Sequence, residues 1–229
     1  MLVDFLWEKK MEYISLEERI LAECKDQNQE YLVKKGTKGL LGLFFALDAS
    51  DLGNAMKQYL DSGNKSGNLK SILCVIPAVL KNGKVFDTEK TISSLKDISP
   101  NCLGEDLFDC VILFSILFDL FYGTSLNDTI DNLNCLSDEC CKKINVAPLP
   151  KLNENAIRNS EWTYISLNAL KDYMKMLETS DAFSIEFKDE VSKSISLFIE
   201  GVVLGNNTDK YAQVDKKYGE TIKNYLLSL

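Results

Sequence analysis

The sequence predicts an all-α protein that forms a single compact multi-helix domain. Apolar residues recur mostly at spacings of three and four, which is typical of helices that bury one face. Alternation typical of strands is scarce, and there are only four prolines. The 229 residues, 45% of them hydrophobic, are enough for one substantial core. No internal repeat or low-complexity tract divides the chain, so we expect residues 1–229 to be one α-helical domain.

The first part of the chain is expected to hold short helices joined by glycine-containing loops. Residues 4–31 predict one or two amphipathic helices, with Leu16, Ile20, Leu21 and Cys24 on one face. The lysine- and glycine-rich residues 34–39 predict a loop. A short apolar helix over 40–47 follows, and then a helix capped by Ser50-Asp51 that ends near Ser62-Gly63.

The middle of the chain predicts the most buried helices. A helix over 69–81 contains Pro77, and Asp87 or Thr88 opens a helix that runs to Ile98. Ser99-Pro100-Asn101 breaks the pattern. A helix from about Leu103 to Tyr122 follows, which contains the most apolar segment of the chain, Cys110–Tyr122, and Gly123 ends it. A helix that is apolar on all sides must be covered on all sides, so this segment is expected to be the centre of the core.

Capping residues also divide the C-terminal half. Ser125 opens a helix, with Asp128 as the acid of a capping box. Residues 144–158, which contain two prolines, are expected to be an extended linker. Three further helices are expected. The first runs from Ser160 to Glu178, the second from Asp181 to Gly205, and the last begins at Asp209.

Charge and hydropathy exclude some classes of function. A net charge of -8 argues against a nucleic-acid partner, because binding phosphates requires a basic face. The most apolar segment, Cys110–Tyr122, is too short to span a bilayer and contains Asp119, so no membrane association is expected. The apolar residues Met1–Trp7 precede Glu8, Lys9 and Lys10, the wrong charge order for a secretory signal. We therefore expect a cytoplasmic or other intracellular protein.

Cysteine and histidine usage limits the chemistry further. The seven cysteines are an odd number and several lie in apolar segments, which indicates reduced, buried thiols in a reducing compartment. The chain has no histidine, which removes the commonest general base and the Ser-His and Cys-His pairs. The adjacent Cys140-Cys141 lacks zinc-site spacing. Any catalysis would depend on carboxylates, lysines or a metal ion.

One turn near the C-terminus gathers several polar side chains. Val202-Val-Leu-Gly-Asn-Asn-Thr-Asp209 combines the end of an apolar helix, a Gly-Asn-Asn turn and a capping sequence. It resembles the Leu-Gly-Gly-Asp-x-Asp-Thr motif of the ADP-ribosylglycohydrolase family, whose two aspartates bind a pair of magnesium ions. Asn207 stands at the first aspartate, Thr208 fills the middle, Asp209 matches the second and Lys210 replaces the threonine.

Other segments resemble the family in the same serial order. From Gly36 onward they cover most of the chain, so residues 36–229 are the part that resembles the family and residues 1–35 are divergent N-terminal helices. The matching segments are Asn68 with Lys70–Val79, Ile98–Asn101, Phe121–Leu126, Trp162–Leu177 and Tyr218–Leu226. The resemblance implies an ADP-ribosylglycohydrolase-like fold. Trp162 and Tyr164 are expected in the core, with stacking on an adenine as the alternative.

The departures from the family fall on its chemistry. Thr37-Lys38-Gly39 stands where the family has the metal-binding Thr-Asp-Asp, Cys74 replaces the substrate-loop arginine, and Ser99-Pro100 replaces Thr-His. Magnesium needs several oxygen ligands, usually including carboxylates, and Asp209 alone cannot balance two such ions. We therefore expect no cofactor, with Asp209 as a weak metal candidate and as an ordinary helix cap by preference.

The sequence thus predicts a catalytically inactive member of the family that binds a protein partner and neutralises or regulates it. A divergent ADP-ribosyl hydrolase that uses magnesium, with Asp48, Asp51 and Asp209 as its acids, is one alternative. A helical adaptor unrelated to the family is another. An ADP-ribose-type ligand would contact Asn68, Asn207, Thr208 and Asp209. The resemblance places Lys38 and Asp209 on opposite sides of the cleft that holds the two magnesium ions in the family. We expect an ion pair between them, in which the Lys38 ammonium takes the place of the metal charge.

Overall fold

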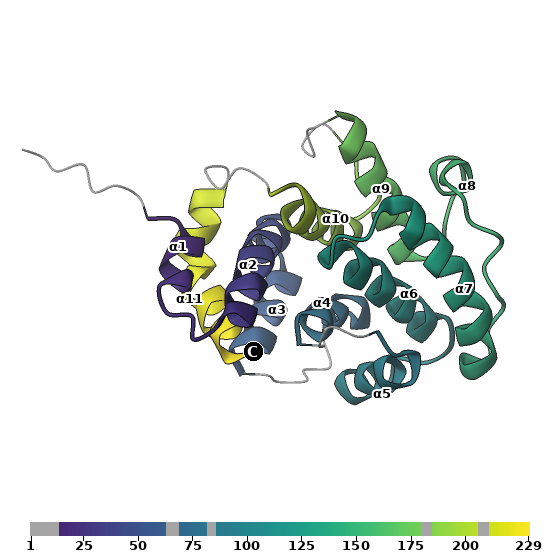
Figure 1. Ribbon diagram of the computed structural model, residues 1–229, viewed down its shortest axis with the longest axis horizontal. Coiled ribbons are helices and arrows are strands. Elements are labelled where there is room, and N and C mark those ends of the chain that lie inside the picture. The colour runs from purple at the N-terminus through teal and green to yellow at the C-terminus, as the bar shows by residue number, and fades with distance from the viewer. Residues whose placement is uncertain (1–13, 63–68, 82–85, 180–184, 206–210) are drawn as a thin grey trace, which may run out of the picture.

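The computed structural model describes residues 14–62, 69–81, 86–179, 185–205 and 211–229. These ranges form one compact all-helical domain and contain no strand, which confirms the predicted fold class (Figure 1). The helices are α1 (Leu16–Leu21), α2 (Gln27–Leu47), α3 (Asp51–Ser62), α4 (Ser71–Lys81), α5 (Thr88–Ile98), α6 (Gly104–Phe121), α7 (Leu126–Ile144), α8 (Glu154–Asn159), α9 (Ile165–Thr179), α10 (Glu190–Leu204) and α11 (Ala212–Ser228).

Short polar side chains fix where many of these helices begin. Ser15 and Glu18 form a reciprocal capping box at α1. The predicted caps Asp87 and Ser125 are confirmed, since each accepts a hydrogen bond from a backbone N–H in the first turn of α5 and α7. Gly205 ends α10 in the left-handed conformation, as predicted.

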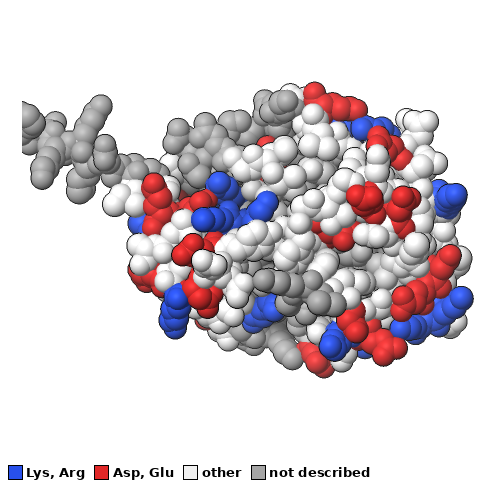
Figure 2. Space-filling view, in the orientation of Figure 1, with Lys and Arg blue, Asp and Glu red and all other residues white. Residues whose placement is uncertain are grey.

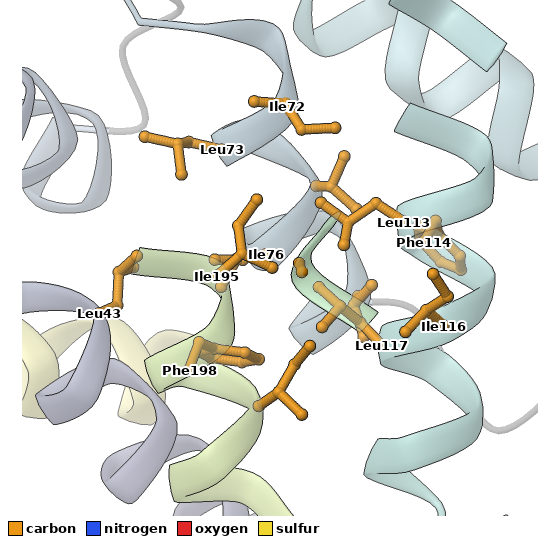
Figure 3. Close-up of a cluster of buried hydrophobic side chains, with 14 of the residues drawn as sticks. Leu43, Ile72, Leu73, Ile76, Leu113, Phe114, Ile116, Leu117, Ile195 and Phe198 are labelled. Atoms are coloured by element: carbon orange, nitrogen blue, oxygen red, sulfur yellow. The ribbon is translucent and has the colours of Figure 1, made fainter. Parts of the chain in front are cut away.

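A single hydrophobic core holds the helices together. Helix α10 packs against both α2 and α6, and so joins the N- and C-terminal helices to the central ones (Figure 1). Figure 3 shows side chains of α2, α4, α6 and α10 meeting there. In α6, Leu113 and Leu117 are 0% and 2% exposed, which confirms that this helix is the buried centre.

The expected loop over residues 34–39 is wrong, because α2 is one continuous helix from Gln27 to Leu47. The glycines that suggested a loop lie where other helices come close. A Cβ on Gly39 would lie 2.7 Å from a ring carbon of Phe198 in α10, and one on Gly36 would lie 2.9 Å from Leu226 in α11. Burial of α2 against these helices outweighs the helix-breaking tendency of glycine, which is only about 1 kcal/mol per residue.

Three expected boundaries in the C-terminal half are also wrong. Ser160 ends α8 instead of opening a helix, and α9 begins at Ile165. The expected linker over 144–158 therefore contains the short helix α8, which Asn153 caps. Helix α10 is capped by Asp189 and begins at Glu190, so the helix expected from Asp181 to Gly205 is not continuous. Helix α11 begins at Ala212, after the opening expected at Asp209. Asp181 and Asp209 lie outside the described residues.

The described helices include none that is long and apolar enough to cross a membrane. On the face in Figure 2, acidic and basic side chains are interspersed. All seven cysteines lie in the described ranges and are free thiols, and all except the half-buried Cys24 and the exposed Cys135 are buried.

Candidate functional site

Most of the residues predicted to form a substrate site lie outside the described part of the chain. Asn68, Asn207, Thr208 and Asp209 belong to this group. The substrate contacts assigned to them, the metal candidate Asp209 and the Lys38–Asp209 ion pair therefore stay predictions.

Lys38 is described, and its surroundings bear on the resemblance. Its ammonium group lies 3.3 Å from the carboxylate of Glu17 in α1. It also lies 3.7 Å from the position that a Cβ on Gly205 would take, directly before the predicted turn. The segments around Lys38 and Gly205 are thus neighbours, as the resemblance requires. Thr37, however, is fully buried inside α2, so Thr37-Lys38-Gly39 does not form a turn that opens a helix.

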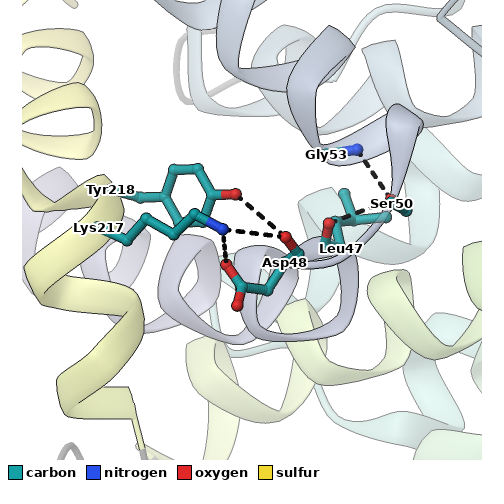
Figure 4. A network of polar contacts seen from close by, with 6 residues as sticks. All are labelled: Leu47, Asp48, Ser50, Gly53, Lys217 and Tyr218. Atoms are coloured by element: carbon teal, nitrogen blue, oxygen red, sulfur yellow. Dashed lines mark hydrogen bonds and ion pairs between the residues drawn. The ribbon is translucent and has the colours of Figure 1, made fainter.

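The two acids of the hydrolase alternative that are described do not share one site. The carboxylate of Asp48, at the end of α2, accepts a hydrogen bond from Lys217 at 2.9 Å, and the Asp48 carbonyl oxygen accepts one from the Tyr218 hydroxyl at 3.5 Å (Figure 4). Asp51 instead lines an open cleft of about 680 Å³ with Lys70 and Glu190. Among the described residues, no group of three or more acidic or cysteine side chains is placed to hold a metal ion.

A cleft of about 760 Å³ runs along one face of α9. Residues 168–179 of α9 line it and span about 16 Å of helix axis. The opposite wall comes from residues 161–162, before α9, and residues 185–188, before α10. We call this feature the α9 cleft.

Two lysines of the α9 cleft are held by backbone carbonyl groups. The Lys171 ammonium donates a hydrogen bond to the Ser160 carbonyl at 2.9 Å, and the Lys188 ammonium donates one to the Trp162 carbonyl at 3.1 Å. These carbonyl groups lie two residues apart in the segment between α8 and α9. They orient the ammonium groups, neither of which forms a salt bridge with a described carboxylate, although Asp172 lies near enough to Lys171 to interact with its charge. Each ammonium has further N–H donors. The two lysines are therefore positioned to bind an anionic group.

A third lysine of the cleft is balanced by a buried carboxylate. Lys175 donates to Asp172 at 3.2 Å, and the Asp172 side chain is 6% exposed. Burial raises the pKa of the Asp172 carboxyl, and the hydrogen bond from Lys175 partly opposes this effect. The second carboxylate oxygen, Oδ2, has no hydrogen-bond partner among the described residues. Asp172 and Lys175 thus form an ion pair in the lining of the cleft, beside the two lysines.

Trp162 lines the cleft beside these lysines and is held in place by hydrogen bonds. Its indole N–H donates to the Ile157 carbonyl, and its own carbonyl accepts from Asn168 at 3.1 Å as well as from Lys188. The ring is 9% exposed, and Tyr164 packs edge-on against Phe108, so Trp162 is buried as expected while Tyr164 is half-buried against the core. Phe187 adds a half-buried aromatic ring to the opposite wall.

Sequence reasoning missed the α9 cleft because its key residues are ordinary in the sequence. Lys171 and Lys175 look like the solvated face of an amphipathic helix, and Lys188 lies far along the chain. Of the residues that line the cleft, Trp162 is the one that the sequence suggests as a ligand contact. No family model, no curated protein and no solved structure matches the chain.

Proposed function

We propose that this protein acts by binding, and that the α9 cleft receives an acidic segment of a protein partner. The observation that carries the proposal is the pair of ammonium groups of Lys171 and Lys188, which backbone carbonyls hold in place and which form no salt bridge with a carboxylate of the described chain. Charge-assisted hydrogen bonds from such donors to carboxylates are about twice as strong as neutral ones. Their fixed positions reduce the entropy lost on binding.

The shape of the α9 cleft favours a segment of a partner over a small molecule. The cleft is open and extends for about 16 Å along α9, which matches about five residues of extended chain. Acidic residues also line it, among them Glu161, Glu178 and Glu186. These carboxylates would repel a ligand with many phosphates. They leave room for an acidic peptide that places one of its carboxylates between Lys171 and Lys188 and keeps its other side chains on the solvent side of the open cleft.

Hydrolysis of ADP-ribose is the less favoured alternative. In the family that the sequence resembles, a pair of magnesium ions needs the Thr-Asp-Asp motif at a helix start. Here the corresponding Thr37-Lys38-Gly39 lies within α2, and Thr37 is fully buried. An ADP-ribosylglycohydrolase-like fold stays a hypothesis, supported by the proximity of Lys38 and Gly205. The binding proposal does not depend on it, and it applies equally to an unrelated helical adaptor.

The fluorescence of Trp162 provides the test of binding. The only other tryptophan is Trp7, so a Trp7→Phe background leaves Trp162 as the sole reporter. Titration with a hexaglutamate peptide should give a saturable change at low salt, and the affinity should fall as salt screens the charges. Hexalysine should give none. ADP-ribose is the probe for the alternative ligand.

Matched variants assign the binding to the two lysines. The double substitution Lys171→Gln with Lys188→Gln should weaken hexaglutamate binding at least tenfold. The exposed Lys151 lies outside the cleft, and Lys151→Gln should leave binding unchanged. Equal affinities of the double variant and the Lys151→Gln variant, or tighter binding of ADP-ribose than of hexaglutamate, would overturn the proposal.

A turnover assay with an ADP-ribosylated protein tests the hydrolase alternative separately. We expect no release of ADP-ribose with or without added magnesium, because the aspartates of the family's first metal motif are missing. Release that depends on magnesium and is lost on Asp209→Ala would establish the hydrolase instead.

A further inference from the structure

A pair of buried cysteines lies in contact at the junction of α5, α6 and α4, away from the α9 cleft. Cys102 lies in the connection between α5 and α6, and Cys110 lies in the second turn of α6. Their sulfur atoms are 3.7 Å apart, within hydrogen-bonding distance for thiols. Both residues are at most 2% exposed. No other pair of thiols in the described chain is hydrogen-bonded in this way.

A small pocket reaches this pair at Cys110. Its volume is about 190 Å³, and Cys110 and Ser71 form part of its wall. Lys70 and Asp106, which are exposed, lie at its rim. Because one water molecule occupies about 30 Å³ in the liquid, a hydroperoxide fits easily.

The hydrogen bond between the thiols makes the two sulfurs chemically unequal. The bond from Cys110 lowers the pKa of the Cys102 thiol, with a smaller contribution from Ser71, while burial opposes both. The same bond raises the pKa of Cys110, and burial adds to that effect. The shared hydrogen bond thus lets one sulfur of the pair act as the nucleophilic thiolate while the other keeps its proton.

We infer that Cys102 and Cys110 form a site that reacts with a hydroperoxide and is converted to a disulfide. The thiolate of one cysteine attacks the terminal oxygen of the peroxide, the O–O bond breaks, and the leaving oxygen takes a proton from solvent to give water or an alcohol. That cysteine is then a sulfenic acid. The other cysteine displaces its hydroxyl group, forming the S–S bond, and its thiol proton leaves with the hydroxide as water.

The local structure permits the small movement that the second step requires. The sulfurs must approach from 3.7 Å to about 2.0 Å, the length of a disulfide bond. Cys110 is fixed in the buried helix α6, while Cys102 belongs to a connection between helices, where it can shift without breaking a helical turn. A disulfide would then tether this connection to the central helix.

Mass spectrometry of the full chain tests the inference. The folded protein is treated with hydrogen peroxide, unfolded, and alkylated with N-ethylmaleimide to label the remaining thiols. Trypsin is unsuitable, because no lysine or arginine separates Cys102 from Cys110. A protease that cuts at aspartate separates them at Asp106 and Asp109. We expect linked peptides that contain Cys102 and Cys110, lighter by two hydrogens, and restored to two alkylated peptides by prior reduction.

Single substitutions provide the controls. Cys102→Ser and Cys110→Ser should each abolish the linked product, whereas Cys140→Ser, at an equally buried cysteine in α7, and Cys135→Ser, at the exposed one, should leave it unchanged. The wild-type mapping decides the question even if a variant fails to fold. Alkylation of both Cys102 and Cys110 after peroxide has oxidised the exposed Cys135 would overturn the inference, and so would Cys102 carrying extra oxygen with no linked product.

Discussion

The contact between α2 and α10 and the α9 cleft use helices of the same chain in opposite ways. Where α2 meets α10, glycines remove side chains from the interface. Gly39 lies against Phe198, Gly42 against the backbone of Leu197, and Gly201 of α10 against the backbone of Lys38. Along α9, polar and charged side chains extend into an open cleft. The first surface is fully packed within the chain, whereas the second contains two ammonium groups that form no salt bridge with a described carboxylate.

The difference shows where a partner can contribute free energy. The α2–α10 contact is buried and packed, so a ligand could add nothing there without displacing a helix. In the α9 cleft the ammonium groups of Lys171 and Lys188 donate to carbonyl groups and form no salt bridge within the described residues, so an incoming carboxylate makes new interactions. Stability and binding are therefore assigned to different helices, and substitutions should separate them.

The largest effect on stability is expected in the core that α10 shares with α6. Leu113→Ala should lower the free energy of unfolding by about 2–5 kcal/mol, because Leu113 is fully buried and the variant leaves a cavity. Leu177→Ala, at a residue of α9 that is 42% exposed, should change it by less than about 0.5 kcal/mol. Urea unfolding measures both. Similar losses for the two variants would mean that the α9 face is as tightly packed as the core.

A smaller loss is expected from a single methyl group between α2 and α10. Gly42→Ala should cost about 1–3 kcal/mol, because the new Cβ meets the rigid backbone of Leu197. Gly36→Ala is the matched control, since its Cβ meets only the movable ends of the Leu226 and Leu80 side chains, and the substitution gains up to about 1 kcal/mol of helix propensity. A Gly42→Ala variant at least as stable as Gly36→Ala would show that α2 and α10 are not in close contact there.

The smallest expected effect is a pH dependence of the free energy of unfolding that arises from Asp172, which lines the α9 cleft. Burial raises the pKa of Asp172 above its ordinary value of 3.8. The stability that this group contributes is therefore fully present below about pH 3.8 and is lost as the pH rises through the folded-state pKa. Relative to wild type, Asp172→Asn should gain stability between pH 4 and pH 7.

Lys175→Gln tests the same group from the other side. Lys175 opposes the rise in the pKa of Asp172, so its removal should make the loss of stability with increasing pH steeper than in wild type. Urea unfolding at several pH values gives the comparison. Parallel curves for wild type, Asp172→Asn and Lys175→Gln would contradict the assignment.

The sequence predicted most of the framework, and the misses have a common physical cause. Caps at Ser50, Asp87 and Ser125 and the central helix α6 follow from local patterns. Because glycine disfavours an isolated helix, the sequence predicts a loop over residues 34–39. Packing of α2 against α10 and α11 reverses that preference, and the helix is continuous. The α9 cleft depends on where Lys188 and the Ser160 and Trp162 carbonyls lie relative to Lys171, and local sequence does not encode such long-range proximity.

An acidic segment that binds in the α9 cleft must contact α9 and the residues that precede α9 and α10. Amide chemical shifts recorded by NMR during a hexaglutamate titration locate that contact residue by residue. We predict that the largest shifts fall on residues 160–175 and 185–188, while residues 36–47 of α2 and 195–204 of α10 change little. Shifts centred on α2 and α10, or no saturable shifts along α9, would contradict the account.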